Sequence, residues 1–256
     1  MNNFCFVLFI GLALIGSCQE SLAFDQAHRG WGEILKTYTE DGFVDYSALK
    51  ESGGGLESYL KAVENVSNDE YTGWSKDEKA AFWINAYNAF TIHTIIDHYP
   101  KKSIKKIPNV WDEKRFATLG QKWSLNQIEH EILRKEFSEP RIHFALVCAS
   151  LGCPTLKDEP YTASDLNSQL DSQVRDFLAD TAKARYDEKK DTLWLSPIFK
   201  WYREDFEKAG GIIVFLQTKG KHYLPPDIEG KVNPRTKISW LGYDWGLNDV
   251  RFPSRS

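Results

Sequence analysis

The sequence predicts a single α+β domain, and three observations support this prediction. The chain has 256 residues, and no repeat, low-complexity tract or long Gly/Ser linker divides residues 24–256. Helical and strand-like segments mix without the regular alternation of a βαβ fold. Residues 77–98 are apolar on almost every side, which is typical of a buried helix. We therefore expect this central helix to pack on a small mixed sheet, with amphipathic helices around it.

Local signals place the helices. A short helix over 25–38 turns Trp31 and Leu35 inward, and an extended stretch follows at 42–49. Ser75 and Glu78 form a capping box that begins the central helix, which Pro100 ends. A Ser-Leu-Asn-Gln motif at 124–127 begins a second helix that runs to about residue 135. Residues 162–165 cap a third helix, whose apolar face carries residues 166, 170, 174 and 177.

Short apolar runs place the strands. Residues 141–148 are apolar and are followed by Gly152 and Pro154, which predicts a buried strand. Residues 191–196 and 237–241 predict two further strands, and residues 199–206 a helical turn between them. We expect the central helix to pack on a sheet that contains 141–148 and 192–196.

Composition and charge exclude several classes of protein. The chain is 42% hydrophobic and 14% aromatic, so it can fill a core and is not disordered. The net charge is −4 with no basic stripe, which gives a nucleic acid no electrostatic support. Four cysteines are too few for a disulfide scaffold, and no zinc, P-loop, dinucleotide-binding or nucleophile-elbow motif occurs. We expect no cofactor and no metal; the partner would be a small molecule or a peptide.

The N-terminal segment predicts export. Residues 4–17 form an uncharged apolar run, too short for a membrane span and typical of a signal peptide. Small residues at 21 and 23 form a cleavage site before Phe24, which leaves a domain over 24–256 in the periplasm or outside the cell, with no membrane span. The alternative is a lipoprotein, because Leu14-Ile15-Gly16-Ser17-Cys18 resembles a lipobox that would place a lipid anchor on Cys18.

Several motifs together resemble one family. They are FWINAYNA at 82–89, IEH at 128–130, RIHFALVCASLGCP at 141–154, LSPIFKWY at 195–202 and YDW at 243–245. In this order, over about residues 75–245, they resemble the family called domain of unknown function 547, here as a bacterial, exported member. The family's activity is not established, so the resemblance implies no catalytic residues. A comparison with papain- or transglutaminase-like folds meets Asn85 where those folds would need a thiol.

Cys148 and Cys153 are the first candidate site. In an exported protein this C-x4-C pair would form a disulfide that closes a short loop. Alternatively, Cys148 is a nucleophilic thiol at the end of a strand, or both cysteines are small buried residues. Intracellular relatives in the same family weigh against the disulfide.

His130, His143 and Glu129 are candidates to act with Cys148. On a strand, His143 would face away from Cys148 and lie roughly 16 Å from it. We therefore predict His130 as the base and His143 as a substrate-binding residue. Glu129 falls within the apolar stripe of its helix, which indicates either a site role or an ion pair with Arg141 or Arg203.

Asn85 and Asn88 share one face of the apolar central helix, where their amides need partners. They would bind a substrate, stabilise an oxyanion or hold loop carbonyls in place. The catalytic hypothesis is a hydrolase or acyl-transfer enzyme with Cys148 as nucleophile, His130 as base and Glu129 as orienting partner, with Asn85, Asn88 and His143 binding substrate. The alternative is a non-catalytic ligand- or partner-binding domain of the cell envelope.

Overall fold

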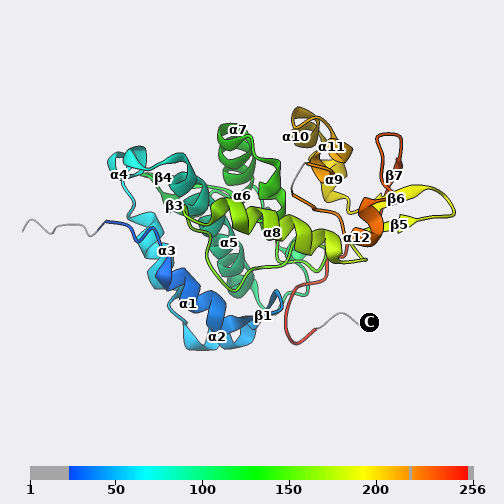
Figure 1. Cartoon of the computed structure of the whole chain (residues 1–256). Coiled ribbons are helices and arrows are strands. Elements are labelled where there is room, and N and C mark those ends of the chain that lie inside the picture. The colour runs from blue at the N-terminus through cyan, green and yellow to red at the C-terminus, as the bar shows by residue number, and fades with distance from the viewer. Residues whose placement is uncertain (1–22, 219–220, 253–256) are drawn as a thin grey trace, which may run out of the picture.

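The protein has the α+β architecture that the sequence predicts (Figure 1). The computed structural model describes residues 23–218 and 221–252. The predicted signal peptide and the alternative anchor at Cys18 lie outside the described residues. Among the residues that are described, no helix is long and apolar enough to cross a membrane.

Helices make up about half of the described chain. The α-helices are α1 (Arg29–Tyr38), α2 (Tyr46–Ser52), α3 (Leu56–Glu64), α4 (Asn68–Gly73), α5 (Lys76–His98), α6 (Leu125–Gln127), α7 (Arg134–Phe137), α8 (Leu166–Ala179), α9 (Ile198–Trp201), α10 (Arg203–Lys208), α11 (Ile212–Leu216) and α12 (Pro226–Glu229). Two 3-10 helices, η1 (Ile104–Lys106) and η3 (Pro140–Phe144), and one π-helical turn, η2 (Ile128–Leu133), complete the set.

Within residues 23–218 and 221–252, the strands form three small sheets. Two are antiparallel pairs, β1 (Thr39–Glu40) with β2 (Phe43–Val44) and β3 (Phe116–Thr118) with β4 (Gln121–Trp123). The third has the order β5-β6-β7, from β5 (Ala184–Asp187), β6 (Thr192–Leu195) and β7 (Lys237–Trp240). It is a mixed sheet, because β6 pairs antiparallel with β5 and parallel with β7.

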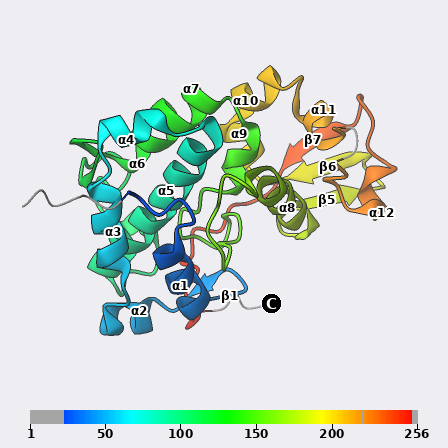
Figure 2. The ribbon, with the colours of Figure 1, turned by 60° about the vertical axis from the view of Figure 1, so that its left-hand side comes forward.

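The predicted central helix is confirmed as α5. Ser75 and Glu78 form the capping box, and burial runs without interruption from Ala80 to Ile92 because apolar side chains cover every face. Its packing partners are α2, α3, α6 and η2 rather than the mixed sheet. The mixed sheet instead lies beside α8 at the other end of the molecule, in a second apolar cluster with α9, α10 and α11 (Figures 1 and 2).

The prediction of a strand over 141–148 is wrong. Pro140 begins the 3-10 helix η3, and an irregular loop follows from Ala145 to Pro154. Asn88 of α5 takes the hydrogen bonds that a neighbouring strand would otherwise make: its amide donates to the Ala145 carbonyl at 3.0 Å and accepts from the Val147 N–H at 2.9 Å. The apolar run is buried as predicted, but burial alone does not distinguish a strand from a helical turn.

Candidate functional site

A pocket opens where six segments of the chain meet. Its walls come from α5, the loop around Trp111, the continuous helix α6–η2, η3 with the loop that follows it, the α9–α10 junction and the C-terminal segment 243–245. The cavity volume is about 170 Å³. The lining residues are Tyr87, Trp111, Asn126, Glu129, His130, His143, Leu146, Cys148, Cys153, Pro154, Ile198, Trp201, Tyr202, Tyr243 and Trp245. Four predicted site residues, Glu129, His130, His143 and Cys148, are thus brought together.

Aromatic side chains form much of the wall. Trp201, Tyr243 and Trp245 pack as a triad, with ring centroids 4.8 Å (Trp201–Tyr243), 4.6 Å (Tyr243–Trp245) and 5.9 Å (Trp201–Trp245) apart. Trp201 is 48% exposed, so the triad forms the rim of the pocket. Such a surface offers both apolar contact and the negative faces of π systems to a ligand.

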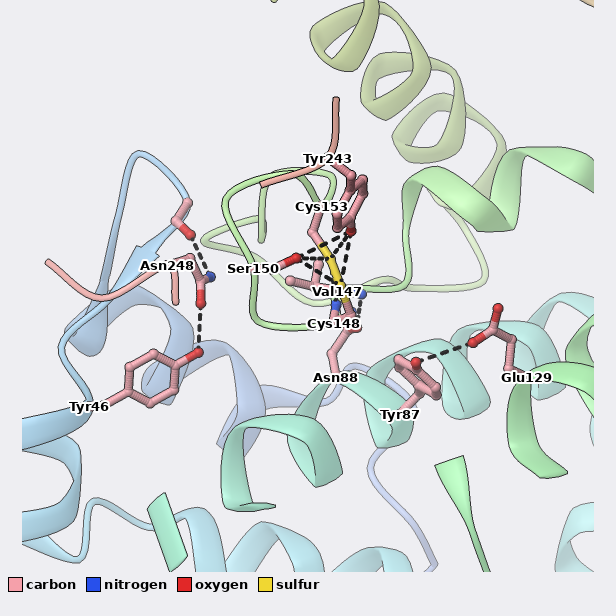
Figure 3. Close-up of a disulfide and its surroundings, with 11 residues drawn as sticks. Tyr46, Tyr87, Asn88, Glu129, Val147, Cys148, Ser150, Cys153, Tyr243 and Asn248 are labelled. Carbon is pink, nitrogen blue, oxygen red and sulfur yellow. Dashed lines mark hydrogen bonds between the residues drawn. A yellow bond between two sulfur atoms is a disulfide. The ribbon is translucent and has the colours of Figure 1, made fainter. Parts of the chain in front are cut away.

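Glu129 supplies the formal charge of the pocket. Its side chain is buried, and the Tyr87 hydroxyl donates a hydrogen bond to Oε2 at 3.2 Å (Figure 3). The expected alternative, an ion pair with Arg141 or Arg203, is wrong: Arg141 pairs with Glu139 and Asp171, and Arg203 pairs with Glu207. Among the described residues that line the pocket, Glu129 is the one carboxylate, and no Lys or Arg joins it.

A π-helical turn delivers Glu129 and His130 to the pocket. The helix that begins at the Ser124 capping box continues as η2 before it returns to α-helical geometry at Arg134. A π turn changes the direction of the side chains that follow it, and such turns occur often at functional sites. Glu129 is therefore on the buried side, as its place in the apolar stripe predicts, while His130 remains half-buried at the pocket wall.

His130 is oriented by Arg134. The guanidinium of Arg134 donates to Nδ1 of His130 at 3.0 Å. Because arginine has no acceptor, Nδ1 must be the unprotonated nitrogen, which assigns the ring proton to Nε2. Arg134 also donates to Asp205 at 2.6 Å, so its charge is balanced outside the pocket. Arg134 thus fixes the orientation of the His130 ring at the pocket wall.

His143 is buried against Tyr202 and held by Asp205. Its ring stacks on Tyr202 with centroids 3.8 Å apart, and Nε2–H donates to Asp205 at 2.9 Å. Burial lowers the pKa of His143 below its usual value, although Asp205 opposes this shift. Nδ1 is buried and has no hydrogen-bond partner among the described residues. His143 and Cys148 line the same pocket, because the strand that would have turned them to opposite faces does not form.

Cys148 and Cys153 form a disulfide, which was the first interpretation of the pair, with Cα atoms 6.1 Å apart. The hydroxyls of Ser150 and Tyr243 each lie within hydrogen-bond distance of the Cys148 sulfur, at 3.1 Å (Figure 3). Burial raises the pKa of Tyr243 to about 12, so this hydroxyl keeps its proton at neutral pH. In this state the Cys148 sulfur lines the pocket but is not a nucleophile.

The C-terminal segment clamps the disulfide loop. The N–H groups of Leu151 and Gly152 donate to the carbonyls of Gly246 and Asp244, both at 2.8 Å. Next to this contact, Asn248 accepts a hydrogen bond from the Tyr46 hydroxyl at 2.8 Å (Figure 3). Backbone hydrogen bonds therefore hold the disulfide loop and the pocket wall at 243–245 together.

Asn85 and Asn88 are not among the pocket-lining residues. Both are buried on α5, where Asn85 binds the backbone of Tyr161 and Asn88 binds the backbone on either side of Leu146. Their amides hold two irregular segments against the helix. Of the three roles that the sequence left open, this is the role of holding loop carbonyls in place.

Sequence reasoning missed the aromatic wall and the Arg134–Asp205 pair. The motifs LSPIFKWY and YDW contain Trp201, Tyr202, Tyr243 and Trp245. Aromatic residues within family motifs could have indicated a binding surface. Arg134 lies one turn after His130 on the same helix, and that spacing was also a usable signal.

These elements define an α+β protein with an aromatic-walled pocket that carries the Glu129 carboxylate and lies beside a disulfide. The family described as "Protein of unknown function, DUF547" matches residues 71–178, which include α5, η2, the disulfide loop and nearly all of α8. The match confirms the family resemblance over that segment, and the motifs at 195–202 and 243–245 lie beyond it. No curated protein and no solved structure shows significant similarity to the chain.

Proposed function

We propose that the chain is an exported protein whose pocket binds a small organic cation. The observation that carries this proposal is the buried carboxylate of Glu129 in a cavity walled by aromatic rings and free of other formal charge among the described lining residues. The disulfide favours binding over thiol catalysis, because it occupies the sulfur that a nucleophile would need. Export rests on the apolar run at 4–17 and the small residues at 21 and 23.

The charge and shape of the pocket favour a cation with a compact body. A carboxylate away from water needs a compensating positive charge, and the π faces of Trp and Tyr also attract cations. Burial lowers the pKa of His143, so its ring carries no charge at neutral pH and does not compete for Glu129. A cavity of about 150 Å³ holds a ring the size of benzene, and the pocket measures about 170 Å³. One ring or a similar group that carries an ammonium therefore fits.

Three matched probes test the charge preference. Benzylamine, benzyl alcohol and benzoate share one ring but differ in charge at neutral pH. We expect calorimetry to show the tightest binding for benzylamine and the weakest for benzoate. Equal affinities for the three, or a preference for benzoate, would contradict the proposal.

Glu129→Gln tests the residue itself. We expect it to remove the preference of benzylamine over benzyl alcohol while leaving the fold intact by circular dichroism. Glu131→Gln is the matched control, because Glu131 is exposed on the same helical turn and should leave all three affinities unchanged. A Glu129→Gln variant that kept the wild-type preference for benzylamine would show that Glu129 does not bind the cation.

A second candidate function concerns the reduced protein. A dithiol reductant would take the disulfide to two thiols and itself become a disulfide. The Cys148 thiol would then lie in the same pocket as His130 and His143. The hydroxyls of Ser150 and Tyr243, 3.1 Å from its sulfur, are placed to donate to a thiolate and stabilise it. A hydrolase or acyl-transfer activity of this form should appear with p-nitrophenyl acetate only after reduction and should be lost in Cys148→Ser.

A further inference from the structure

The backbone nitrogen of Phe24 contacts a carboxylate far along the chain. It lies 2.5 Å from Oε1 of Glu70, in the first turn of α4, and the contact is half-buried. A separation of 46 residues makes this a tertiary contact rather than a local cap. The first described residues run beside α5 (Figure 2), where the Phe24 ring packs on Phe82, while its backbone nitrogen contacts Glu70 of α4.

Glu70 has no cationic partner among the described residues. Every Lys, Arg and His for which an ion pair is found there pairs with another acid. A half-buried carboxylate loses part of its hydration, and a neutral amide N–H compensates less than a charged donor does. The nitrogen of Phe24 therefore occupies the position that a cation would take.

Aromatic packing fixes residue 24 at this point. The Phe24 ring lies 5.1 Å from His28, 5.6 Å from Trp74 and 5.3 Å from Phe82, measured between centroids. Edge-on contacts to His28 and Phe82 hold the ring in the main apolar cluster. The nitrogen that faces Glu70 is thus positioned by a side chain that is itself anchored.

We infer that Phe24 is the N-terminal residue of the mature protein and that Glu70 binds its α-ammonium group. A signal peptidase would add water across the Ala23–Phe24 peptide bond, so that Ala23 leaves with a carboxylate and the released amine of Phe24 takes up a proton. Cleavage replaces an amide donor by an ammonium and creates the missing ion pair. The inference rests on the proposed export, but capture by Glu70 is a separate property of the folded domain.

Two experiments test cleavage and capture separately. The intact mass of the exported protein tests cleavage before Phe24, and the stabilities of four proteins test capture of the α-ammonium group by Glu70. The full chain is expressed with its own N-terminal segment, and the exported protein is weighed. In parallel, chains that start at Phe24 or at Ser21 are prepared, each with Glu70 or with Glu70→Gln. Urea unfolding then gives the ratio of folded to unfolded protein for each of the four.

We expect a mass that begins at Phe24. We also expect Glu70→Gln to lower the folded-to-unfolded ratio about fivefold more in the Phe24 chain than in the Ser21 chain, as for a partly buried ion pair. Asp69→Asn is the matched control, since Asp69 is exposed in the same helical turn and should act equally on both chains.

Each contrary outcome overturns a defined part. A mature mass that begins at Cys18, or an uncleaved chain, overturns cleavage before Phe24 and with it the inference. A mass that begins at Phe24, combined with equal effects of Glu70→Gln in both chains, leaves export standing and overturns capture by Glu70.

Discussion

The side-chain amide of Asn85 pairs with the backbone of Tyr161 through two hydrogen bonds. Nδ2 donates to the carbonyl oxygen at 2.7 Å, and Oδ1 accepts from the N–H at 3.0 Å. This pair imitates the contact between two strands, although one partner is a helix side chain. It explains how an irregular segment lies against a fully buried helix without leaving buried backbone groups unpaired.

Replacing Asn85 should therefore destabilise the protein. Asn85→Ala leaves a buried N–H and a buried carbonyl without partners, which should cost about 2–4 kcal/mol in the free energy of unfolding. Urea denaturation measures this cost. Asn65→Ala, at an exposed helix end, should change the free energy by less than about 0.5 kcal/mol. A loss below about 1 kcal/mol for Asn85→Ala would show that the pair is not structural.

The close approach of Gly152 to the C-terminal segment predicts a second effect. A Cβ at this position would lie 3.0 Å from the backbone N and O of Asp244. Gly152→Ala should therefore displace the segment, cost about 1–3 kcal/mol and weaken benzylamine binding. Gly230→Ala is the control, because nothing lies within 4 Å of its added Cβ. Unchanged benzylamine binding in Gly152→Ala would show that ligand binding does not depend on the contact between the disulfide loop and the C-terminal segment.

The disulfide should contribute modestly to stability. Closing a short loop lowers the entropy of the unfolded chain, and the effect for this spacing is about 2 kcal/mol. A dithiol reductant should lower the free energy of unfolding of the wild type by this amount. The double variant Cys148→Ser/Cys153→Ser should already be that much less stable and should not respond to reductant. Equal responses of the two proteins would mean that the reductant acts elsewhere.

His28 should make stability depend on pH. Burial lowers the pKa of His28 to about 4, with Asp25 opposing the shift. Both folded and unfolded states are neutral at this residue above pH about 6.5. Below that pH the unfolded chain takes up a proton that the folded protein refuses, so stability should fall as the pH decreases from about 6.5 to about 4.

His28→Asn should remove this part of the pH dependence, measured as the free energy of unfolding between pH 7 and pH 4. Asparagine tolerates the left-handed backbone of residue 28, where φ is 48°. His222→Asn is the matched control: that residue also has a positive φ, of 47°, but is exposed. If the two variants keep the same slope as the wild type, His28 is not responsible for it.

Local signals in the sequence were enough for the helices but not for the disulfide loop. Ser75, Glu78 and Pro100 fix the limits of α5 through nearest-neighbour chemistry, so its prediction needed no tertiary information. The shape of residues 141–154 depends on Asn88 and on the segment 243–248, which lie far away in the sequence. An apolar run alone could not reveal those partners.

The same limit applies to the pocket. The burial of Glu129 follows from helical periodicity and could be predicted. The presence of His143 in the same pocket could not be predicted. The sequence indicated a strand for this segment, and a strand would have turned His143 to another face, but the segment forms a 3-10 helix. The Tyr202 and Tyr243 contributions depend on how separate segments pack, which a single sequence does not specify.

Because the C-terminal segment holds the disulfide loop, the loop can take its final structure only after the end of the chain has been synthesised. A ribosome delivers α5, η2 and the two cysteines long before it delivers Tyr243 and Trp245. Asp249, which accepts a hydrogen bond from the Tyr99 hydroxyl at 2.6 Å, follows them. The two cysteines therefore lack this wall until the C-terminal segment has been made. The pocket is complete only when residues 243–245 have been synthesised and have packed against the disulfide loop.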